Sequence, residues 1–384
     1  MIGSATAGLD KLVSLDDRSR ERPLRERVRA GLVALADGFA WPLRASHYLE
    51  LVNPLWSAHA VRARVLEATR ETADARTLTL RPGRGWRRHR AGQLVSVGVT
   101  IDGARHVRTY SISSAPERTD GRITITVKAV PGGRVSRHLV HELEPGAYVD
   151  LGVPQGDFVL PEAMPVRPLF VTAGSGITPV MSMLRSFAAR DGVPDVVHVH
   201  YAPHAEHVIF RDELAALARR FPRYRLHVLA TRGEGGSRRR FSAATLDELC
   251  PDWRRRDVWA CGPESLLDAV ETEWTAAGLE HRVHVERFHA RLAEPPAQAA
   301  GGRVRFSRSG VTVDADATTT LLRAAEGAGL RPAHGCRIGI CHSCTARLAA
   351  GCVRDVRSNR RVDEPGAMIQ LCVSAASGDV EVEA

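Results

Sequence analysis

Hydrophobic and polar residues alternate through residues 61–160 in short runs separated by turn sequences. The runs are RVLEAT, TLTLRP, QLVSVGV, RITITVKAV and GAYVDLGV, and the turns include PGRG, DGAR, PGGR and EPG. Alternation with a period of two is typical of strands that have one buried face. This part of the chain therefore predicts an antiparallel β-barrel or sandwich.

Beyond Pro168 the pattern changes to short apolar runs that alternate with helical stretches. The apolar runs occupy residues 168–173, 196–201, 225–230, 257–261 and 281–286, and the helical stretches include RDELAALARRF and PESLLDAVETEW. Such alternation favours a parallel sheet covered by helices, because successive parallel strands are usually joined by a helix.

The last part of the chain follows a linker rich in Pro, Ala and Gly, RLAEPPAQAAGG at residues 291–302. After it, RVRFSRSGVTVDADATTTLLRAAEGAG predicts a hairpin and a helix, and DVEVE predicts a final strand. The predicted domains are a helical N-terminal extension (1–58), a barrel (59–163), a parallel-sheet α/β domain (164–290), the linker (291–302) and a C-terminal domain (303–384).

The N-terminal extension is basic, and its apolar residues keep helical spacing: Val28, Leu32, Leu35 and Phe39. One interpretation packs this helix on the body of the protein. The other places residues 22–57 at a membrane surface, with Trp41 and Trp56 near the lipid headgroups.

Composition narrows the class of protein. Of the 384 residues, 44% are hydrophobic and 25% are charged, which is ordinary for globular domains, and the seven cysteines do not suggest a secreted disulfide framework. We expect no signal peptide, and no stretch approaches the roughly 18 apolar residues that a membrane span needs. We expect a monomer in the cytoplasm, with peripheral contact at the inner face of the membrane as an option.

The net charge of +9 does not indicate nucleic-acid binding. Only two of the 53 basic residues, Lys11 and Lys128, are lysine, and the arginines are scattered over every segment. No basic stripe interleaved with aromatic residues stands out. A positive surface would instead speed encounters with acidic electron-transfer partners or anionic membrane.

Four cysteines near the end of the chain carry the strongest chemical signal. Cys336, Cys341 and Cys344 form a C-x4-C-x2-C motif, and Cys372 follows after 27 residues. This spacing predicts a plant-type [2Fe–2S] cluster, and Gly335 and Gly339 would let backbone amides approach the sulfides. Structural zinc is the alternative, but zinc sites are usually built from C-x2-C or H-x3-H pairs, and here the second half offers a single cysteine.

A flavin site is suggested by the segment Arg108-Thr109-Tyr110-Ser111-Ile112. An arginine can bind phosphate, an aromatic ring can stack on an isoalloxazine ring, and a hydroxyl can bind near its reactive nitrogen. About twenty residues on, glycines and a serine at a helix start could hold a pyrophosphate. The candidate residues of this segment are Gly132, Gly133, Val135 and Ser136. Read singly, the two segments are also compatible with a polar strand end and an ordinary turn.

A nucleotide site is suggested by a strand, a glycine turn and a helix in FVTAGSGITP. The residues are Gly174, Gly176, Thr178 and Pro179. Glycine lets the backbone meet a pyrophosphate, although the spacing differs from G-x-G-x-x-G. Cys261-Gly262-Pro263 ends a later strand, where a buried core thiol is the alternative interpretation of Cys261.

Together these motifs resemble the ferredoxin–NADP+ reductase superfamily, in its oxygenase-reductase branch, over residues 60–384. The resemblance implies FAD, with Arg108 on a flavin phosphate, Tyr110 stacked on the ring and Ser111 near N5. It implies that the glycine turn binds the nicotinamide dinucleotide, that Cys261 lies beside the nicotinamide, and that Glu286 and Phe288 lie near the flavin edge. Ile112, Val135, Gly262 and Pro263 are included among the cofactor-binding residues, and a ferredoxin-like β-grasp domain is expected around the cluster.

The choice of nucleotide depends on a 2′-phosphate. Thr231-Arg232 lies where NADPH-using relatives carry Ser-Arg, and Arg238, Arg239 and Arg240 follow. We therefore expect NADPH in preference to NADH. Cys352 and Cys250 are expected to be non-ligands.

The sequence says least about the electron acceptor. The segment HYLELVNPLWSAHAVRARV resembles the reductases of membrane fatty-acyl-CoA desaturases, which makes such a desaturase the first expectation. The alternative is a reductase for a soluble oxygenase or a cytochrome P450. A third hypothesis, of another class, is a non-catalytic redox sensor or scaffold.

Overall fold

A computed structural model describes residues 50, 52–57, 61–190, 192–232, 240–288, 293–296, 299–339 and 342–384. The chain divides into two compact units, Met1–His59 and Ala60–Ala384. The predicted helical face of the extension and Trp41 lie outside the described residues. Within the first unit, Asn53 caps the 3-10 turn η1 (Pro54–Trp56), its side chain accepting a hydrogen bond from Leu55 N at 3.0 Å. No helix of the described residues is long and apolar enough to cross a membrane.

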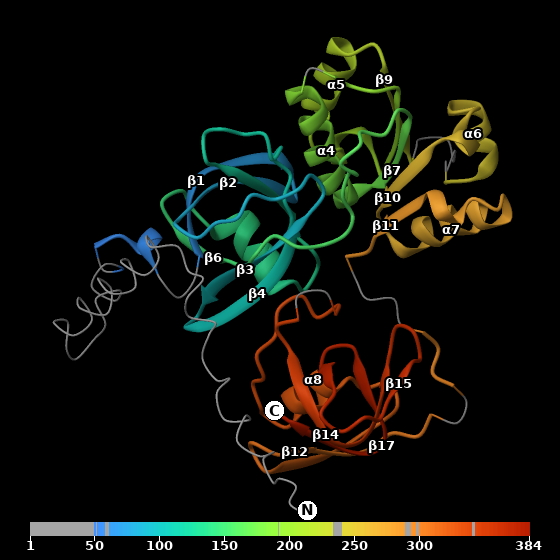
Figure 1. Cartoon of the computed structure of the whole chain (residues 1–384). Coiled ribbons are helices and arrows are strands. Elements are labelled where there is room, and N and C mark those ends of the chain that lie inside the picture. The colour runs from blue at the N-terminus through green and yellow to red at the C-terminus, as the bar shows by residue number, and fades with distance from the viewer. Residues whose placement is uncertain are drawn as a thin grey trace, which may run out of the picture. The chain divides into compact units, whose positions relative to one another are not determined.

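The first sheet of the second unit is the predicted antiparallel barrel, here called the barrel domain. Its strand order is β4-β3-β6-β1-β2-β5. The strands are β1 (Val61–Thr72), β2 (Ala75–Pro82), β3 (Leu94–Ile101), β4 (Ala104–Ser111), β5 (Ile123–Lys128) and β6 (Tyr148–Leu151), drawn in blue to green in Figure 1. A bridge between Ile112 and Ile125 joins the two edges of the sheet. The alternating apolar residues fill the barrel interior, which confirms the expected fold.

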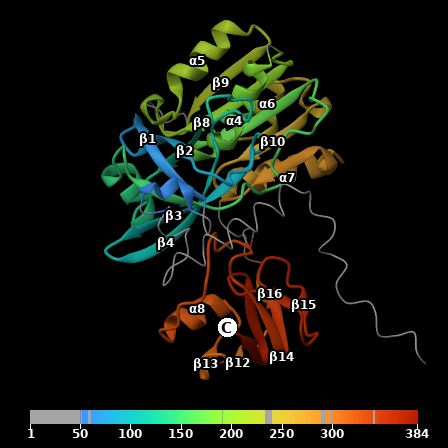
Figure 2. The ribbon, with the colours of Figure 1, turned by 60° about the vertical axis from the view of Figure 1, so that its left-hand side comes forward.

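The second sheet is parallel, as predicted, and forms the parallel-sheet domain. Its order is β11-β10-β7-β8-β9, from β7 (Pro168–Ala173), β8 (Val196–Ala202), β9 (Tyr224–Ala230), β10 (Asp257–Cys261) and β11 (Val283–Glu286). Helices α4 (Ile177–Ala189) and α5 (Arg211–Arg220) cover one face, and α6 (Ala243–Leu249) and α7 (Glu264–Ala276) cover the other (Figures 1 and 2). Two separate apolar clusters, one on each face, bury the helices against the strands.

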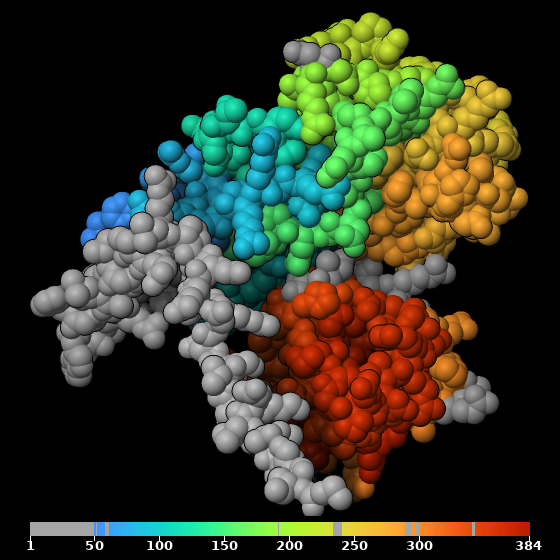
Figure 3. Space-filling view, in the orientation of Figure 1, coloured from blue at the N-terminus to red at the C-terminus, as the bar shows by residue number. Residues whose placement is uncertain are grey.

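The third sheet is the ferredoxin-like domain, drawn in orange and red in Figure 3. Its order is β13-β12-β17-β14-β15, with β16 on β14. The elements are β12 (Gly302–Phe306), β13 (Val311–Ala315), α8 (Leu321–Gly327), β14 (Thr345–Asp355), β15 (Arg361–Val362), β16 (Met368–Gln370) and β17 (Ser374–Glu383). The hairpin, helix and final strand match the expectation, whereas β14 to β16 were not foreseen.

Hydrogen bonds join α4 to the barrel domain. Ser182 Oγ donates to Ser114 O at 2.7 Å, and Arg185 Nη1 donates to Ser113 O at 2.8 Å. Ser113 and Ser114 come two and three residues after the end of β4, so the helix that begins at the glycine turn is tied to the strand that carries Arg108 and Tyr110.

Candidate functional site

One cavity of about 400 Å³, here called the flavin cavity, brings together most of the predicted flavin residues. It is lined, among others, by Arg108, Tyr110, Ser111, Gly132, Gly133, Val135, Ser136, Thr178, Glu286 and Phe288. These residues come from β4, from the turn after β5 and the short helix α3 (Arg134–Arg137) that follows it, from α4 and from the end of β11. Ile112 does not line the cavity, because it is fully buried in the barrel interior.

Strand β4 presents the aromatic and basic side chains of the cavity. It is an edge strand paired with β3, and Tyr110 lies opposite Val95. Burial raises the pKa of Tyr110, so its ring stays neutral and can offer an apolar face to a stacked ligand. Burial also lowers the pKa of Arg108, whose Nη1 donates to the carbonyl of Val107 at 2.7 Å. The remaining donors of this guanidinium suit a phosphate.

The turn after β5 is tight enough to require glycine. Gly132 has a φ of +70°, and a Cβ on Gly133 would lie 2.5 Å from Ser136 Oγ. Ser136 Oγ accepts a hydrogen bond from Val130 N at 3.2 Å and donates to Gly133 O at 3.3 Å. The serine hydroxyl therefore holds the turn closed. With the aromatic ring, the arginine and this glycine cradle in one cavity, the residues fit a flavin dinucleotide.

The glycine turn of the parallel-sheet domain packs against the Cys261-Gly262 segment. A Cβ on Gly176 would lie 2.1 Å from Cys261 O, so a side chain at this position would force the two strand ends apart. Gly174 has a φ of +54°, which a glycine adopts without strain. Thr178, the second residue of α4, lines the flavin cavity, whereas Gly174, Gly176 and Pro179 line neither large cavity.

Cys261 and Glu286 are paired in register on the parallel strands β10 and β11. Cys261 is fully buried, and burial, with the Glu286 carboxylate as a smaller cause, raises the pKa of its thiol well above the usual value. Burial, with Asp157 as a smaller cause, raises the pKa of Glu286 to about 7. Glu286 can therefore hold or release a proton near neutral pH at the wall of the flavin cavity, while Cys261 stays a neutral thiol.

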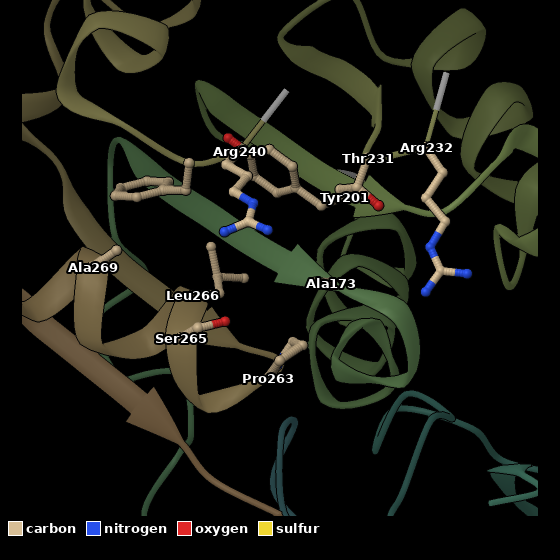
Figure 4. Close-up of a pocket in the computed structure, with 10 residues that line it drawn as sticks. Ala173, Tyr201, Thr231, Arg232, Arg240, Pro263, Ser265, Leu266 and Ala269 are labelled. Carbon is tan, nitrogen blue, oxygen red and sulfur yellow. The ribbon is translucent and has the colours of Figure 1, made fainter. Parts of the chain in front are cut away.

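A second cavity, of about 650 Å³ and here called the nucleotide cavity, lies at the carboxyl ends of the parallel strands (Figure 4). It is lined by Ala173, Tyr201, Thr231, Arg232, Arg240, Phe241, Pro263, Ser265, Leu266 and Ala269. Figure 4 shows the guanidinium groups of Arg232 and Arg240 on either side of Tyr201 and Thr231. The predicted Arg232 and Pro263 are thus in one cavity, and Gly262 packs against Ala173 beside it. Arg238 and Arg239 lie outside the described residues.

Tyr201 and Phe241 were not predicted as site residues. Tyr201 precedes the end of β8, its hydroxyl has no hydrogen-bond partner among the described residues, and burial raises its pKa to about 12. The sequence could have indicated Tyr201 through its position near the end of an apolar run, because ligands of open parallel sheets bind beyond the carboxyl ends of the strands.

Three of the four predicted cluster ligands are described, and all three are buried: Cys336, Cys344 and Cys372. A hydrogen bond with Cys344, and then burial, raise the pKa of Cys372, so these two sulfur atoms lie close together. Cys341 lies outside the described residues. Among the described residues no group of three or more His, Cys, Asp or Glu is placed to hold a single metal ion. Converging buried thiols on a glycine-containing loop fit a [2Fe–2S] cluster, which takes four cysteines in all.

The two remaining thiols of interest lie elsewhere. Cys352, on β14, accepts a hydrogen bond from Arg361 Nε at 3.3 Å. Cys250 is buried at the end of α6, where its thiol lies 3.5 Å from Asp252 Oδ1.

Comparisons with known proteins agree with this division of the chain. Residues 62–160 match the oxidoreductase FAD-binding domain, residues 170–272 the oxidoreductase NAD-binding domain, and residues 304–377 the 2Fe-2S iron-sulfur cluster binding domain. The fold and the cavities thus define a flavin- and iron–sulfur-dependent oxidoreductase.

Individual relatives extend over most of the chain. An NADPH oxidoreductase of Mycobacterium tuberculosis is 48% identical over 341 residues, covering 88% of each protein. The glycine betaine monooxygenase reductase subunit of Pseudomonas aeruginosa is 32% identical over 316 residues, covering 76% of this chain and 86% of that protein. Phthalate dioxygenase reductase, a solved structure, superposes with a TM-score of 0.61 at 25% identity, covering 85% of this chain and 98% of its own.

The chain belongs to the ferredoxin–NADP+ reductase type of NAD(P)H-dependent oxidoreductases that carry FAD and a C-terminal plant-type [2Fe–2S] domain. The expected fold, the enzyme class, FAD and the [2Fe–2S] cluster are thereby confirmed.

Proposed function

We propose that this protein is the NADPH-dependent reductase component of an oxygenase system. The observation that carries the proposal is the presence, in one chain, of the flavin cavity, the nucleotide cavity and the clustered cysteines. Relatives named for monooxygenase and dioxygenase systems share this arrangement over most of their length. The acceptor would be a soluble oxygenase or a cytochrome P450, which was the alternative in the sequence analysis.

In the barrel domain we assign binding and orienting roles to the cavity residues. Arg108 would hold a flavin phosphate, Tyr110 would cover one face of the ring, and Ser111 would bind near the reactive nitrogen. The turn at Gly132 and Gly133 would accept the pyrophosphate through its backbone amides, which is the reason for favouring FAD over FMN.

To residues of the parallel-sheet domain we assign the recognition of NADPH and the exclusion of water. Arg232 and Arg240 would bind the 2′-phosphate, since both guanidinium groups border the nucleotide cavity. Cys261 and Glu286 would border the nicotinamide, with the thiol neutral and the carboxyl group able to hold a proton. Phe288 would close the flavin edge.

When bound, FAD accepts two electrons from NADPH and releases them singly, and a plant-type cluster of roughly −400 mV passes them on one at a time. The chain's own residues hold these groups, orient them and keep water out. The proposed boundaries are 59–163 for the FAD domain, 164–290 for the NAD(P) domain and 303–384 for the cluster domain, with a linker at 291–302.

A membrane acyl-CoA desaturase is the second candidate acceptor. The observation that favours it is the segment at residues 47–65, HYLELVNPLWSAHAVRARV, which resembles desaturase reductases. In its described part Val52 is 75% and Trp56 38% exposed, which suits a peripheral contact with lipid or with a membrane partner.

The experiment that separates the two candidates is anaerobic NADPH oxidation by the purified holoenzyme, followed by aerobic turnover with each acceptor. Product formed with a soluble oxygenase and not with desaturase-containing membranes supports the main proposal. Unsaturated acyl-CoA formed only with membranes supports the second. Rapid NADPH oxidation with ferricyanide but no transfer to the cluster would contradict both.

A further inference from the structure

An ion pair beyond the cysteine motif lies against the loop that carries the cluster ligands. Arg357 belongs to the turn between β14 and β15, and Asp355 ends β14. Arg357 Nη2 donates to Asp355 Oδ2 at 2.7 Å and its Nε donates to Oδ1 at 3.1 Å. The backbone N–H of Arg357 also donates to Asp355 Oδ1, at 2.8 Å. The two hydrogen bonds from Nη2 and Nε fix the direction of the guanidinium, and the backbone bond holds the carboxylate in place.

The third nitrogen of that guanidinium reaches the cluster loop. Arg357 Nη1 lies 3.4 Å from the carbonyl oxygen of Gly339, to which Gln370 Nε2 also donates at 3.1 Å. Gly339 has a φ of +78°, and a Cβ built on it would lie 2.3 Å from Arg357 Nη1. The guanidinium thus lies in the space that a side chain at position 339 would take, and the positive φ favours glycine there.

The charge of Arg357 is felt by the sulfur atoms of two ligands. The Asp355 carboxylate is the main cause that raises the pKa of Arg357, and the thiolates of Cys372 and Cys336 raise it further. Arg357 is 36% exposed and Asp355 is 19% exposed, so solvent screens this charge only in part.

Arg337, the arginine within the cluster loop itself, has other partners than Arg357. Arg337 pairs with both carboxylate oxygens of Glu326 on α8, and its Nη2 lies 2.8 Å from His334 Nε2. The carboxylate of Glu326 on α8 therefore neutralises the charge of Arg337. Arg357 instead comes from a distant part of the domain and approaches the loop at a backbone carbonyl.

We propose that Arg357, held by Asp355, is a tuning residue that raises the reduction potential of the [2Fe–2S] cluster. Reduction adds one negative charge to the cluster, so a fixed cation nearby stabilises the reduced form. Asp355 opposes this effect electrostatically while it orients the guanidinium. The inference concerns the cluster alone and holds whichever acceptor takes the electron.

The test is a redox titration of the purified, cluster-loaded full chain, in which the reduced cluster is measured by electron paramagnetic resonance. We expect Arg357→Gln to lower the reduced-to-oxidised ratio of the cluster about tenfold at a given ambient potential, a shift of about −59 mV for a one-electron couple. Asp355→Asn should shift the potential in the opposite direction. Arg357→Lys, which keeps the charge, should stay within about twofold of the wild-type ratio.

The matched control is Arg360→Gln, which removes an exposed arginine three residues further along the same turn. It should change the ratio less than about twofold, and the flavin potential should be unchanged in every variant. The iron and sulfide content of each variant verifies that it carries the cluster.

An unchanged potential in Arg357→Gln, or equal shifts in the Arg357→Gln and Arg360→Gln variants, would overturn the proposal. If Arg357→Gln holds no cluster, Asp355→Asn decides alone, and an unchanged or lowered potential there overturns the proposal. Because no acceptor takes part, failure here is distinct from failure of the proposed function.

Discussion

Cys261 and Glu286 lie opposite each other at the carboxyl ends of the neighbouring parallel strands β10 and β11. One is fully buried and the other is 7% exposed, and the Glu286 carboxyl borders the flavin cavity. A neutral thiol beside a carboxyl group whose pKa is about 7 makes the site sensitive to pH in the physiological range.

The first prediction concerns Glu286. Because its pKa is raised to about 7, its carboxyl group is protonated below that pH and charged above it. A negative charge beside the flavin disfavours arrival of a hydride, so the rate of flavin reduction by NADPH should fall as the pH rises through about 7. In Glu286→Gln the rate should stay at the low-pH level. Stopped-flow measurements across this range check it; an unchanged pH profile in the variant would contradict it.

A second effect of the same group is on stability. The pKa of Glu286 in the folded protein lies above the usual value of 4.5. The contribution of this group to the free energy of unfolding is therefore complete below about pH 4.5 and is lost as the pH rises through 7. Glu286→Gln should therefore unfold less readily than the wild type at about pH 8, by on the order of 2–3 kcal/mol. Chemical denaturation at that pH is the measurement, and a variant less stable than the wild type would count against it.

The third prediction concerns two buried histidines of the parallel-sheet domain. Thr172 Oγ1 lies 2.8 Å from His198 Nε2 and 2.8 Å from His200 Nδ1, and both rings are fully buried. Burial lowers the pKa of His200 to about 3, and burial with His200 lowers that of His198. The unfolded chain binds protons near pH 6.5, so stability is full above that pH and falls below it, by about 1.4 kcal/mol per pH unit for each histidine.

Urea denaturation between about pH 6 and pH 4 tests this prediction. His200→Leu should reduce the slope of stability against pH by about one proton. A slope equal to that of the wild type would show that His200 is charged in the folded protein or does not contribute.

The fourth prediction concerns the contact of the glycine turn with Cys261. In Gly176→Ala the new Cβ would lie 2.1 Å from Cys261 O, so the backbone must move, and we expect a loss of about 2–3 kcal/mol and slower flavin reduction. Gly327→Ala is the control, since nothing lies within 4 Å of its Cβ position. Equal effects of the two substitutions on the reduction rate would refute the prediction.

The fifth prediction concerns nucleotide choice. Arg232→Gln and Arg240→Gln should each lower kcat/KM for NADPH about 10- to 100-fold and leave that for NADH nearly unchanged, because each removes a charged hydrogen bond to the 2′-phosphate. Arg219→Gln, an exposed arginine of α5, serves as the control. Equal losses with both nucleotides would mean that the arginines act on the fold or on another part of the nucleotide.

Much of the fold could be predicted from the sequence because the burial pattern of many strands is simple. The strands of the barrel and parallel-sheet domains follow apolar runs, and those runs are visible in the sequence. Strand β14 was missed because it is interrupted: its pairing with β17 shifts register near Gly351, which has a φ of +86° and would place a Cβ 2.2 Å from Asp379 O. A bulge of this kind breaks the period of two on which the prediction depends.

The site could be predicted where a single segment carries the chemistry, as Arg108 and Tyr110 do on β4. It could not be predicted where tertiary packing brings separate segments together. Tyr201 reaches the nucleotide cavity only because β8 ends there, and Ile112 turns into the barrel interior although it adjoins the motif. The contact of Arg357 with Gly339 depends on a turn that no local pattern specifies.

The proposed function requires that electrons pass from NADPH through the flavin to the four-cysteine cluster. Its most direct test is anaerobic stopped-flow reduction by NADPH of the wild type, Cys336→Ser and the control Cys352→Ser, followed at flavin and cluster wavelengths. We predict flavin reduction in all three proteins, followed by cluster reduction in the wild type and Cys352→Ser only. A cluster retained and reduced in Cys336→Ser, or lost in Cys352→Ser, would contradict the assigned ligands. A flavin that NADPH does not reduce in the loaded wild type would contradict the account as a whole.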